Sequence, residues 1–368
     1  MFAPLLSTAL LASSALAADT CNGHAELCQR SYANVTYLGA HDSYAVGDSL
    51  FANQAKPVED QLADGIRVLQ LQTHKNNGAI HLCHTACNFL DDGPLDEYLA
   101  KVQTWAEANP SEVVTLIVTN PELTDPSEFG QAFQKAGLDK RAYKPPQATT
   151  AFNEWPTLGS LIDAGTNVVV FMDSKADTSK VDYIIPEWGN IWEDAYNVVD
   201  TDWGCAVNRS NGDTATQMFM INHYLDKSLG SLGVMPDKAS LGTTNSKASL
   251  DKHVSNCNML YGRAPTFVLL DFYSSNGNEP FEWVAGLNGV PAPTNKVETG
   301  NIDGKNASPQ DVQNAGAGAS GTDASKTTQT GIVGTQDANG VKSSATALKV
   351  AGGSVAAALV GAAALFAL

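Results

Sequence analysis

Histidine and aspartate side chains lie at the ends of several apolar segments in this sequence. His41 and Asp42 directly follow one such segment, His84 ends a second and Asp271 closes a third. Because the ordinary pKa of histidine is about 6.5, two imidazoles can accept and donate protons near neutral pH. A carboxylate can hold one of them in the required tautomer. We therefore interpret these residues as a candidate general acid–base site.

Polar side chains also end the other apolar segments, and we interpret them as candidates for binding a substrate. Along one segment Gln70, Gln72 and His74 alternate with apolar residues, so in an extended strand all three point to the same side. An alternative for Asp173 is to cap the turn that follows it. The complete set of substrate-binding candidates is Gln70, Gln72, His74, Asn120, Asp173 and His223.

The remaining histidines have plainer interpretations. His81, and His74 taken singly, fit surface or loop positions, and His24 lies in an N-terminal loop with no indicated role. His253 lies on a predicted helix, where we expect it to be solvated.

Seven apolar segments of strand length recur along the chain, and most are rich in β-branched residues, as strands buried on both faces are. We predict helices between many of them, two of which end at Gly137 and Gly262. Alternating strands and helices predict an α/β fold, an irregular (β/α)8 TIM barrel in a single domain, whose chemistry lies at the carboxyl ends of the strands. An eighth strand is expected between residues 181 and 199. The predicted strands cover residues 35–41, 68–74, 79–84, 113–120, 167–173, 218–224 and 266–272, and the predicted helices residues 94–109, 127–136 and 249–261.

Composition divides the chain into four parts. Residues 1–17 form a short apolar run that predicts a secretory signal peptide, and residues 18–291 hold the barrel. Residues 292–343 contain no aromatic side chain and are rich in Gly, Ala, Ser and Thr, which predicts a disordered stalk. Residues 344–368 end in an uncharged apolar run that predicts a GPI-attachment signal, removed in the mature protein. The alternative for this tail is a membrane-spanning anchor.

The six cysteines fit an oxidising, secreted location. Spacing favours the pairs Cys21–Cys28, Cys83–Cys87 and Cys205–Cys257, although other pairings remain open. A zinc site is the alternative for Cys83 and Cys87 beside two histidines, His81 and His84. Three N-x-S/T sequons, at Asn34, Asn208 and Asn306, predict glycosylation.

The formal net charge of −17 argues against binding to nucleic acid. It equally argues against binding an anionic membrane through bulk electrostatics. Membrane attachment is expected only through the GPI anchor, at the plasma membrane or the cell wall. We expect a monomer.

Five motifs in succession resemble a known family, the phosphatidylinositol-specific phospholipase C-like phosphodiesterases, and especially their secreted fungal-type members. The resemblance covers most of residues 34–283, with little match between residues 177 and 210. The motifs are Leu38–Tyr44, Gln61–His74, His81–Leu99, Trp105–Asn120 and Pro265–Tyr273.

The resemblance implies a barrel that cleaves a phosphodiester of an inositol phospholipid or a related substrate. His41 would be the general base that deprotonates the inositol 2-hydroxyl, and His84 the general acid that protonates the departing glycerol oxygen. Asp271 matches the carboxylate that holds the base histidine, and Asp42 is a supporting partner. A cyclic inositol phosphate would be the product.

One part of the family pattern is missing. The family meets the phosphate charge with calcium, held by carboxylates on the second strand, or with an arginine there. This sequence has Gln70 and Gln72 in those places, and Asn120 replaces a charged residue on the next strand. Neutral amides make a poor calcium site, so we expect no metal and no other cofactor. A protonated His74 could supply the missing positive charge.

Two other functions remain open at this point. A barrel with a degenerate site could act as a binding protein of the cell surface or wall. A wall glycosidase would need a carboxylate pair across one cavity, from Asp173, Asp271, Glu122 or Glu193. A metal-dependent glycerophosphodiesterase would need a Glu-x-Asp pair at the position of Gln70 and Gln72.

Overall fold

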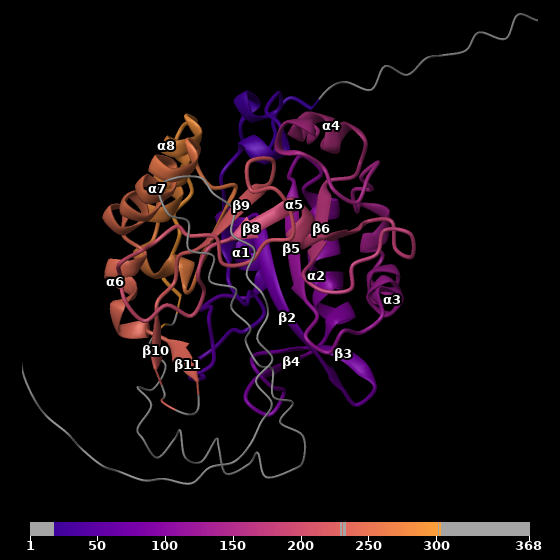
Figure 1. Ribbon diagram of the computed structural model, residues 1–368, viewed down its shortest axis with the longest axis horizontal. Helices are drawn as coiled ribbons and strands as arrows, with labels where there is room; N and C mark the ends of the chain where they lie inside the picture. Colours follow the sequence, from indigo (N-terminus) through magenta and orange to yellow (C-terminus); the bar gives the residue numbers. More distant parts are fainter. Residues whose placement is uncertain (1–17, 229, 231–232, 301, 303–368) are drawn as a thin grey trace, which may run out of the picture. The chain divides into compact units, whose positions relative to one another are not determined.

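The computed structural model describes residues 18–228, 230, 233–300 and 302, and a curled sheet of parallel strands forms its centre (Figure 1). The strand order is β7-β6-β5-β2-β1-β12-β9-β8, and no pairing joins β7 to β8 within the described residues. The predicted α/β class and irregular eight-stranded barrel are therefore confirmed. The strands are β1 (Tyr37–Ala40), β2 (Val68–Asn76), β5 (Val114–Thr119), β6 (Val168–Met172), β7 (Ile184–Pro186), β8 (Ile191–Glu193), β9 (Met218–Asn222) and β12 (Phe267–Leu270).

The predicted strand at residues 79–84 is real but does not join the barrel. β3 (Ala79–Cys83) pairs antiparallel with the end of β2 and then with β4 (Asp91–Pro94). Only Asn77 and Gly78 separate β2 from β3, and both have positive φ, 49° and 84°. Two such residues make a hairpin turn, whereas a parallel neighbour needs a crossover of about a dozen residues. Two short strands, β7 and β8, lie in the region of the expected eighth strand instead.

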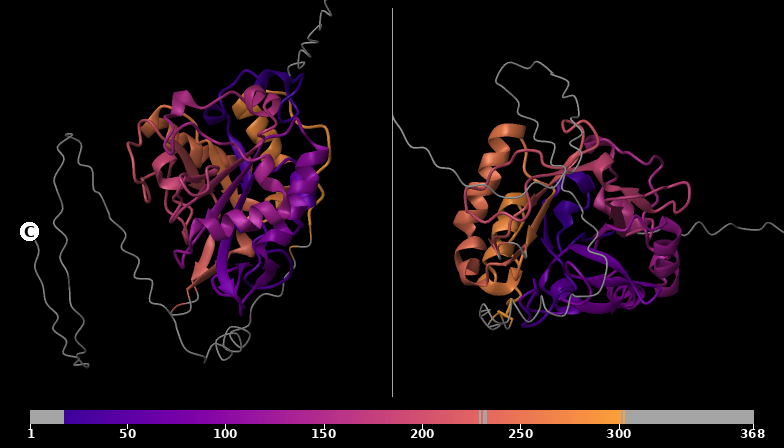
Figure 2. Two further views of the ribbon diagram at one scale, coloured as in Figure 1. Left: turned by 90° about the vertical axis from the view of Figure 1, so that its right-hand side faces the viewer. Right: turned by 60° about the horizontal axis from the view of Figure 1, so that its bottom comes forward.

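Helices pack against the outer face of the sheet. The three predicted helices are present, and Gly137 and Gly262 end two of them in the left-handed conformation. Figure 2 shows the orange C-terminal helices and the violet-to-magenta helices on different sides of the strands. The helices are α1 (Val58–Asp64), α2 (Leu95–Ala108), α3 (Pro126–Ala136), α4 (Leu158–Asp163), α5 (Glu187–Asn190), α6 (Leu241–Thr244), α7 (Lys247–Tyr261) and α8 (Glu279–Asn288).

Short elements complete the described chain. A small hairpin of β10 (Asp226–Ser228) and β11 (Val234–Pro236) lies apart from the main sheet. The 3-10 turns are η1 (Ala25–Leu27), η2 (Tyr32–Asn34), η3 (Leu138–Lys140), η4 (Phe152–Glu154), η6 (Lys238–Ser240) and η7 (Tyr273–Asn276).

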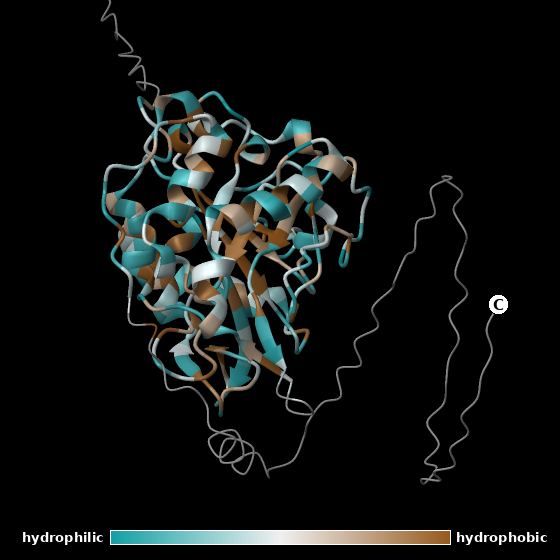
Figure 3. Ribbon diagram, turned by 90° about the vertical axis from the view of Figure 1, so that its left-hand side faces the viewer, coloured by the Kyte–Doolittle hydropathy of each residue, from teal (hydrophilic) through white to brown (hydrophobic). Residues whose placement is uncertain are grey.

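Alternate residues of each strand belong to two apolar layers. Leu69 and Leu71 of β2 join the outer layer, where helix residues such as Leu99 and Phe133 cover them. Val68 of β2 joins the inner layer, which also takes alternate residues of β5, β6, β9 and β12. Figure 3 shows the brown, apolar strands enclosed by helices of mixed polarity. Polar residues at the inner positions near the strand ends therefore meet at the mouth of the barrel.

Three disulfides join the cysteines as spacing predicted, Cys21–Cys28, Cys83–Cys87 and Cys205–Cys257. The chain also stays in contact with the barrel beyond the predicted boundary at residue 291. Val297 is buried, and its backbone N–H donates to the Asn278 side chain at 2.7 Å. The first residues assigned to the stalk thus pack against the domain.

Several predictions fall on other residues. The signal peptide, most of the stalk, the GPI signal and the Asn306 sequon lie outside the described residues. Within the described part of the chain, no helix is both long and apolar enough to span a bilayer.

The inner layer leaves no room for a side chain at Gly39, two residues before His41. A Cβ there would lie 2.5 Å from Leu269 Cδ2 and 2.9 Å from Val68 Cβ. We expect Gly39→Ala to lower the free energy of unfolding by about 1–3 kcal/mol, because overpacking forces neighbouring strands apart. Chemical denaturation measures this, with Gly204→Ala as the control, since a Cβ at Gly204 meets no atom within 4 Å. Equal stability of the two variants would contradict the close approach.

Candidate active site

Parallel pairing of β1 with β12 joins the first histidine to its carboxylate. The register places Ala40 beside Leu270, so His41 and Asp271 leave the sheet side by side. His41 Nδ1 donates to Asp271 Oδ1 at 2.9 Å, and Asn53 Nδ2 donates to the same oxygen at 3.0 Å. The imidazole is thereby held through Nδ1, which leaves Nε2 as the nitrogen available to accept a proton.

Asp42 lies between the two candidate catalytic histidines. Its Oδ2 atom is 3.7 Å from His41 Nε2 and 3.4 Å from His84 Nε2. His84 Nδ1 lies 2.7 Å from the carbonyl oxygen of Phe51 and must donate to it, because a carbonyl only accepts. The structure thus brings His41, His84, Asp271 and Asp42 together, although 230 residues separate His41 from Asp271.

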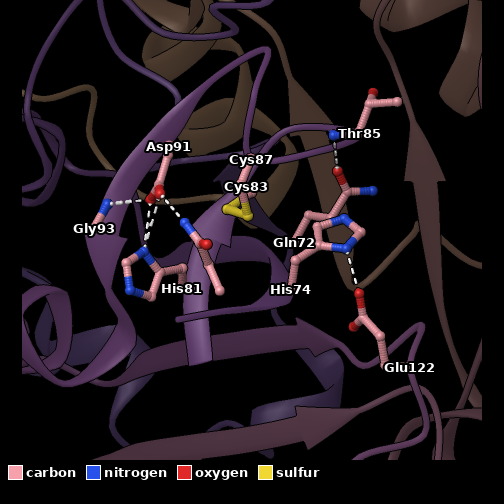
Figure 4. The surroundings of a disulfide bond; sticks show 10 residues. Gln72, His74, His81, Cys83, Thr85, Cys87, Asp91, Gly93 and Glu122 are labelled. Carbon is pink, nitrogen blue, oxygen red and sulfur yellow. Dashed lines mark hydrogen bonds and ion pairs between the residues drawn. A yellow bond between two sulfur atoms is a disulfide. The ribbon is translucent and has the colours of Figure 1, made fainter. Parts of the chain in front are cut away.

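A short disulfide loop carries His84. Cys83 and Cys87 enclose it, with Cα atoms 4.8 Å apart. The neighbouring Thr85 donates its backbone N–H to the side-chain oxygen of Gln72, as Figure 4 shows. The loop is therefore closed by the disulfide and hydrogen-bonded to β2.

Two carboxylates set the charge of His41. Burial alone would lower its pKa, but the charges of Asp42 and Asp271 and the hydrogen bond to Asp271 outweigh burial and raise the pKa from 6.5 to about 9. The Tyr224 ring stacks on the imidazole, with centroids 3.9 Å apart and planes 5° apart. A ring face favours a cation, so this contact also suits a protonated His41.

Asp226 adds a third carboxyl group near His41. Burial and the charge of Asp271 raise the pKa of Asp226 to about 7, against the opposing charge of His41. The region around His41 is therefore rich in carboxylates. The strand pattern did not single out Asn53 or Asp226, because they lie beyond the predicted strands, where alternation gives no signal. Tyr224 ends the predicted strand 218–224, but the candidates considered there were histidine, amide and carboxylate side chains.

A second polar cluster lies at the carboxyl ends of β6 and β8. Arg209, from the loop after β8, pairs with the buried Glu193 and lies over the rings of Trp188 and Tyr196, 4.7 and 4.4 Å from their centroids. Burial raises the pKa of Asp173, and the charge of Arg209 opposes that rise. Arg209 is a positive charge at the barrel mouth that the sequence did not reveal, since it lies in the stretch without family resemblance.

The assignment of His223 to substrate binding is wrong. His223 is fully buried, with Nδ1 2.9 Å from His253 Nδ1 and Nε2 2.8 Å from the carbonyl oxygen of Thr244. Strand alternation explains this, because Asn222 takes the inner position and His223 the outer one, against the helices. The expected exposure of His253 is also wrong, since it is buried and bonded to Asp194 at 2.7 Å.

The other substrate-binding candidates have protein partners. Asn120 is buried and binds the backbone of Thr124 and Ser174, and its own backbone N–H donates to Asp173. His74 lies in the β2–β3 hairpin, where its Nδ1 atom is 2.6 Å from Glu122 (Figure 4). The structure therefore does not bring His74 to the two catalytic histidines. His81, in the same hairpin, pairs with Asp91 at 2.9 Å.

Among the described residues, the zinc site considered for Cys83 and Cys87 can be tested against the positions of the donor atoms. Cys83, Cys87 and Asp91 form the one grouping of metal-ligating residues compact enough for an ion, and its two sulfurs are bonded to each other. Zinc therefore finds no thiolate there.

The comparisons with known proteins agree with this geometry. The PI-PLC X 1 family profile matches residues 27–282. A PI-PLC X domain-containing protein 1 of Arthroderma benhamiae is 39% identical over 275 residues, 73% of this chain and 90% of that protein. A protein of the same fungus described as an uncharacterized secreted protein is 37% identical, over 73% of this chain and 64% of its own length.

More distant relatives share the fold. A PI-PLC X domain-containing protein of Arabidopsis thaliana is 26% identical over 69% of this chain and 62% of that protein. The phosphatidylinositol-specific phospholipase C of Listeria monocytogenes, 15% identical, covers 71% of this chain with 95% of its own and has a TM-score of 0.50. A variant of the phosphatidylinositol-specific phospholipase C of Staphylococcus aureus is 12% identical. The match covers 72% of this chain and 94% of that chain, with a TM-score of 0.51.

The curled barrel of parallel strands, with two histidines at its mouth, is of the phospholipase C-like class of proteins. The chain belongs to the PI-PLC X domain family.

The two carboxylates beside His41 predict an alkaline titration. We expect the His41 imidazole to titrate near pH 9 in NMR of ¹⁵N-histidine-labelled protein. Asp271→Asn should lower that pKa, because a negative charge and a hydrogen bond to the cation are lost. Because the folded protein binds the proton more tightly, His41 stabilises the fold below about pH 6.5, and this stability is lost as the pH rises through about 9.

The exposed Asp182→Asn serves as the control, since Asp182 pairs with Lys144 on the surface. A His41 pKa near 6.5 in the wild type, or one unmoved by Asp271→Asn, would contradict the assigned charges.

Proposed function

We propose that this protein is a secreted phosphodiesterase that cleaves inositol phospholipids, or closely related phosphodiesters, by histidine acid–base catalysis without a metal. The observation that carries the proposal is the pair of imidazoles whose Nε2 atoms both face Asp42 Oδ2, at 3.7 and 3.4 Å. Each ring has its Nδ1 atom held elsewhere, by Asp271 or by the Phe51 carbonyl. Family membership supports the same class of reaction.

The proposed reaction needs His41 neutral and His84 protonated. His41 Nε2 takes the proton of the inositol 2-hydroxyl, whose oxygen attacks phosphorus. The bond from phosphorus to the glycerol oxygen breaks, and His84 Nε2 gives that oxygen its proton. A cyclic inositol phosphate and diacylglycerol leave. Because the pKa of His41 before substrate binds is about 9, raising the pH toward 9 increases the fraction of neutral base. The reaction also needs a protonated His84, so the activity should show a bell-shaped dependence on pH rather than a continuous rise.

The second polar cluster supports recognition of a polyol head group. Asp173 and Glu193, at the carboxyl ends of β6 and β8, and Arg209 supply acceptors and donors, and aromatic rings flank Arg209. Clusters of this composition suit hydroxyl groups. Arg209 is also the cation we propose in place of the family's strand arginine or calcium, a role for which His74 is badly placed.

One assay tests the reaction. Full-length protein from a secretory host is incubated at pH 7–9 with vesicles of phosphatidylinositol, with vesicles of phosphatidylcholine and with a β-glucan, each with and without chelator. We expect a cyclic inositol phosphate from the first alone, unaffected by chelator. Loss of a general acid or base costs about 10²–10⁴-fold, so His41→Ala and His84→Ala should lose at least that much.

Each other outcome rejects this function in a defined way. Sugar release would indicate a glycosidase, although Glu122 is already bonded to His74 and Glu193 to Arg209. Loss of activity with chelator would indicate a bound metal. If no product is released from any substrate at any pH, the result would favour a binding protein of the cell surface.

We propose that the protein is attached to the cell surface through a GPI anchor and is glycosylated at its sequons. The apolar residues of segment 344–368 and the small residues before them support this. Deleting residues 344–368 should move the protein from the membrane fraction to the medium, measured by immunoblot after fractionation. A protein that stays with the membrane after this deletion would contradict the anchor.

A further inference from the structure

Two glutamines of β2 bind the backbone directly after each catalytic histidine. Gln70 Oε1 accepts the Asp42 N–H at 2.8 Å, and Gln72 Oε1 accepts the Thr85 N–H. Asp42 follows His41, and Thr85 follows His84. The same interaction therefore occurs twice, once at each imidazole.

Both residues held by the glutamines have an unusual backbone conformation. The φ angle is 39° at Asp42 and 61° at Thr85. Residues other than glycine rarely adopt positive φ, and for a β-branched threonine this conformation is strained. Such a conformation persists only where other contacts hold it. At each site the glutamine oxygen supplies one such contact.

The histidines are thereby fixed on both sides. Their own backbone N–H groups donate to the carbonyls of Leu270 and Leu90, at 3.0 and 3.1 Å, and the following N–H groups donate to the glutamines. Because Gln70 and Gln72 are two residues apart on one strand, their Cα atoms are about 6.8 Å apart and their side chains share a face. One rigid strand thus sets the separation of base and acid.

The chemistry of the mouth explains why amides occupy these positions. Arginine offers only donors and cannot accept a backbone N–H. At position 70 a carboxylate could accept it, but would add negative charge beside Asp42. A glutamine accepts the hydrogen bond and stays neutral.

We propose that Gln70 and Gln72 are positioning residues that hold His41 and His84 in register for proton transfer, rather than ligands of the phosphate. The proposal rests on the proposed function for its kinetic consequences. On this proposal, the two glutamines that stand where the family has carboxylates or an arginine have a structural role in holding the histidines.

The test compares substitutions that remove or keep the acceptor. Gln→Met preserves length and removes the amide oxygen, while Gln→Glu keeps an oxygen acceptor. Two inositol phosphodiesters serve as substrates, one with an alkyl leaving group and one with a nitrophenyl group that departs without a proton. Gln131→Met, on the exposed face of α3, is the matched control.

The two glutamines should give different results. Gln72→Met disturbs the acid, so kcat on the alkyl substrate should fall by about 10²-fold, with less than about 3-fold change on the nitrophenyl substrate. Gln70→Met disturbs the base and should slow both substrates alike. KM should change little, and Gln72→Glu should restore most of the alkyl activity.

Hydrogen exchange gives a measurement that is independent of activity. The Asp42 and Thr85 amides should be protected in wild type, lose protection in the respective Gln→Met variant and regain it in Gln→Glu. Unchanged protection, or a Gln72→Met variant that raises KM on both substrates at constant kcat, would overturn the proposal. If wild type cleaves neither substrate, the proposed function fails, while exchange at Thr85 still decides the positioning role.

Discussion

Parallel pairing of β1 with β12 is the constraint on which the candidate site depends. The register Ala40–Leu270 brings two residues from opposite ends of the domain to one edge of the sheet, where His41 bonds Asp271. Gln54 reinforces the junction, since its Nε2 donates to the carbonyl oxygens of His41 and Leu270 at 2.7 and 2.9 Å. A slip of one residue would turn Asp271 toward the helices and leave the imidazole without its carboxylate.

The second feature of the site is its excess of carboxylates. Asp42, Asp226 and Asp271 surround a single imidazole, and together they raise its pKa to about 9 despite burial. A phosphodiester anion approaching this region meets repulsion unless cations offset it. Arg209 lies at the other polar cluster of the mouth, and Tyr224 covers one face of the His41 ring. That cluster also holds the carboxyl groups of Asp173 and Glu193, so carboxyl groups are present on both sides of the mouth.

A buried histidine pair illustrates how the fold accommodates charge away from the mouth. Burial and the neighbouring charge of His253 lower the pKa of His223 to about 3, so His223 is neutral. Since its Nε2 must donate to the Thr244 carbonyl, its Nδ1 accepts from His253. The other ring nitrogen of His253, Nε2, lies 2.7 Å from Asp194 Oδ2, so the three side chains form one buried polar network. Removing one member of such a buried network is costly, because its partner is left without a polar contact. The Trp203 ring packs against both imidazoles.

Residue types and periodicity alone determined the α/β class, most strands and the three long helices. Spacing favoured the disulfide pairs that the structure contains, and the strand ends indicated His41, His84 and Asp271 as candidate residues. These features are local, or depend on a period of two or 3.6 residues that the chain itself displays. The same signals misassigned β3, although Asn77 and Gly78 mark a hairpin turn, and His223, although alternation gives the inner position to Asn222.

Tertiary structure decided everything that depends on distance between segments. Asn53 and Arg209 lie in loops, Tyr224 follows β9 and Asp226 begins β10, and the strand pattern marked none of the four. The pKa of His41 depends on three carboxyl groups that only folding brings together. The part played by Gln70 and Gln72 depends on which backbone N–H each meets, because a side chain's neighbours across the sheet follow from strand register and loop geometry, which the order of residues does not display.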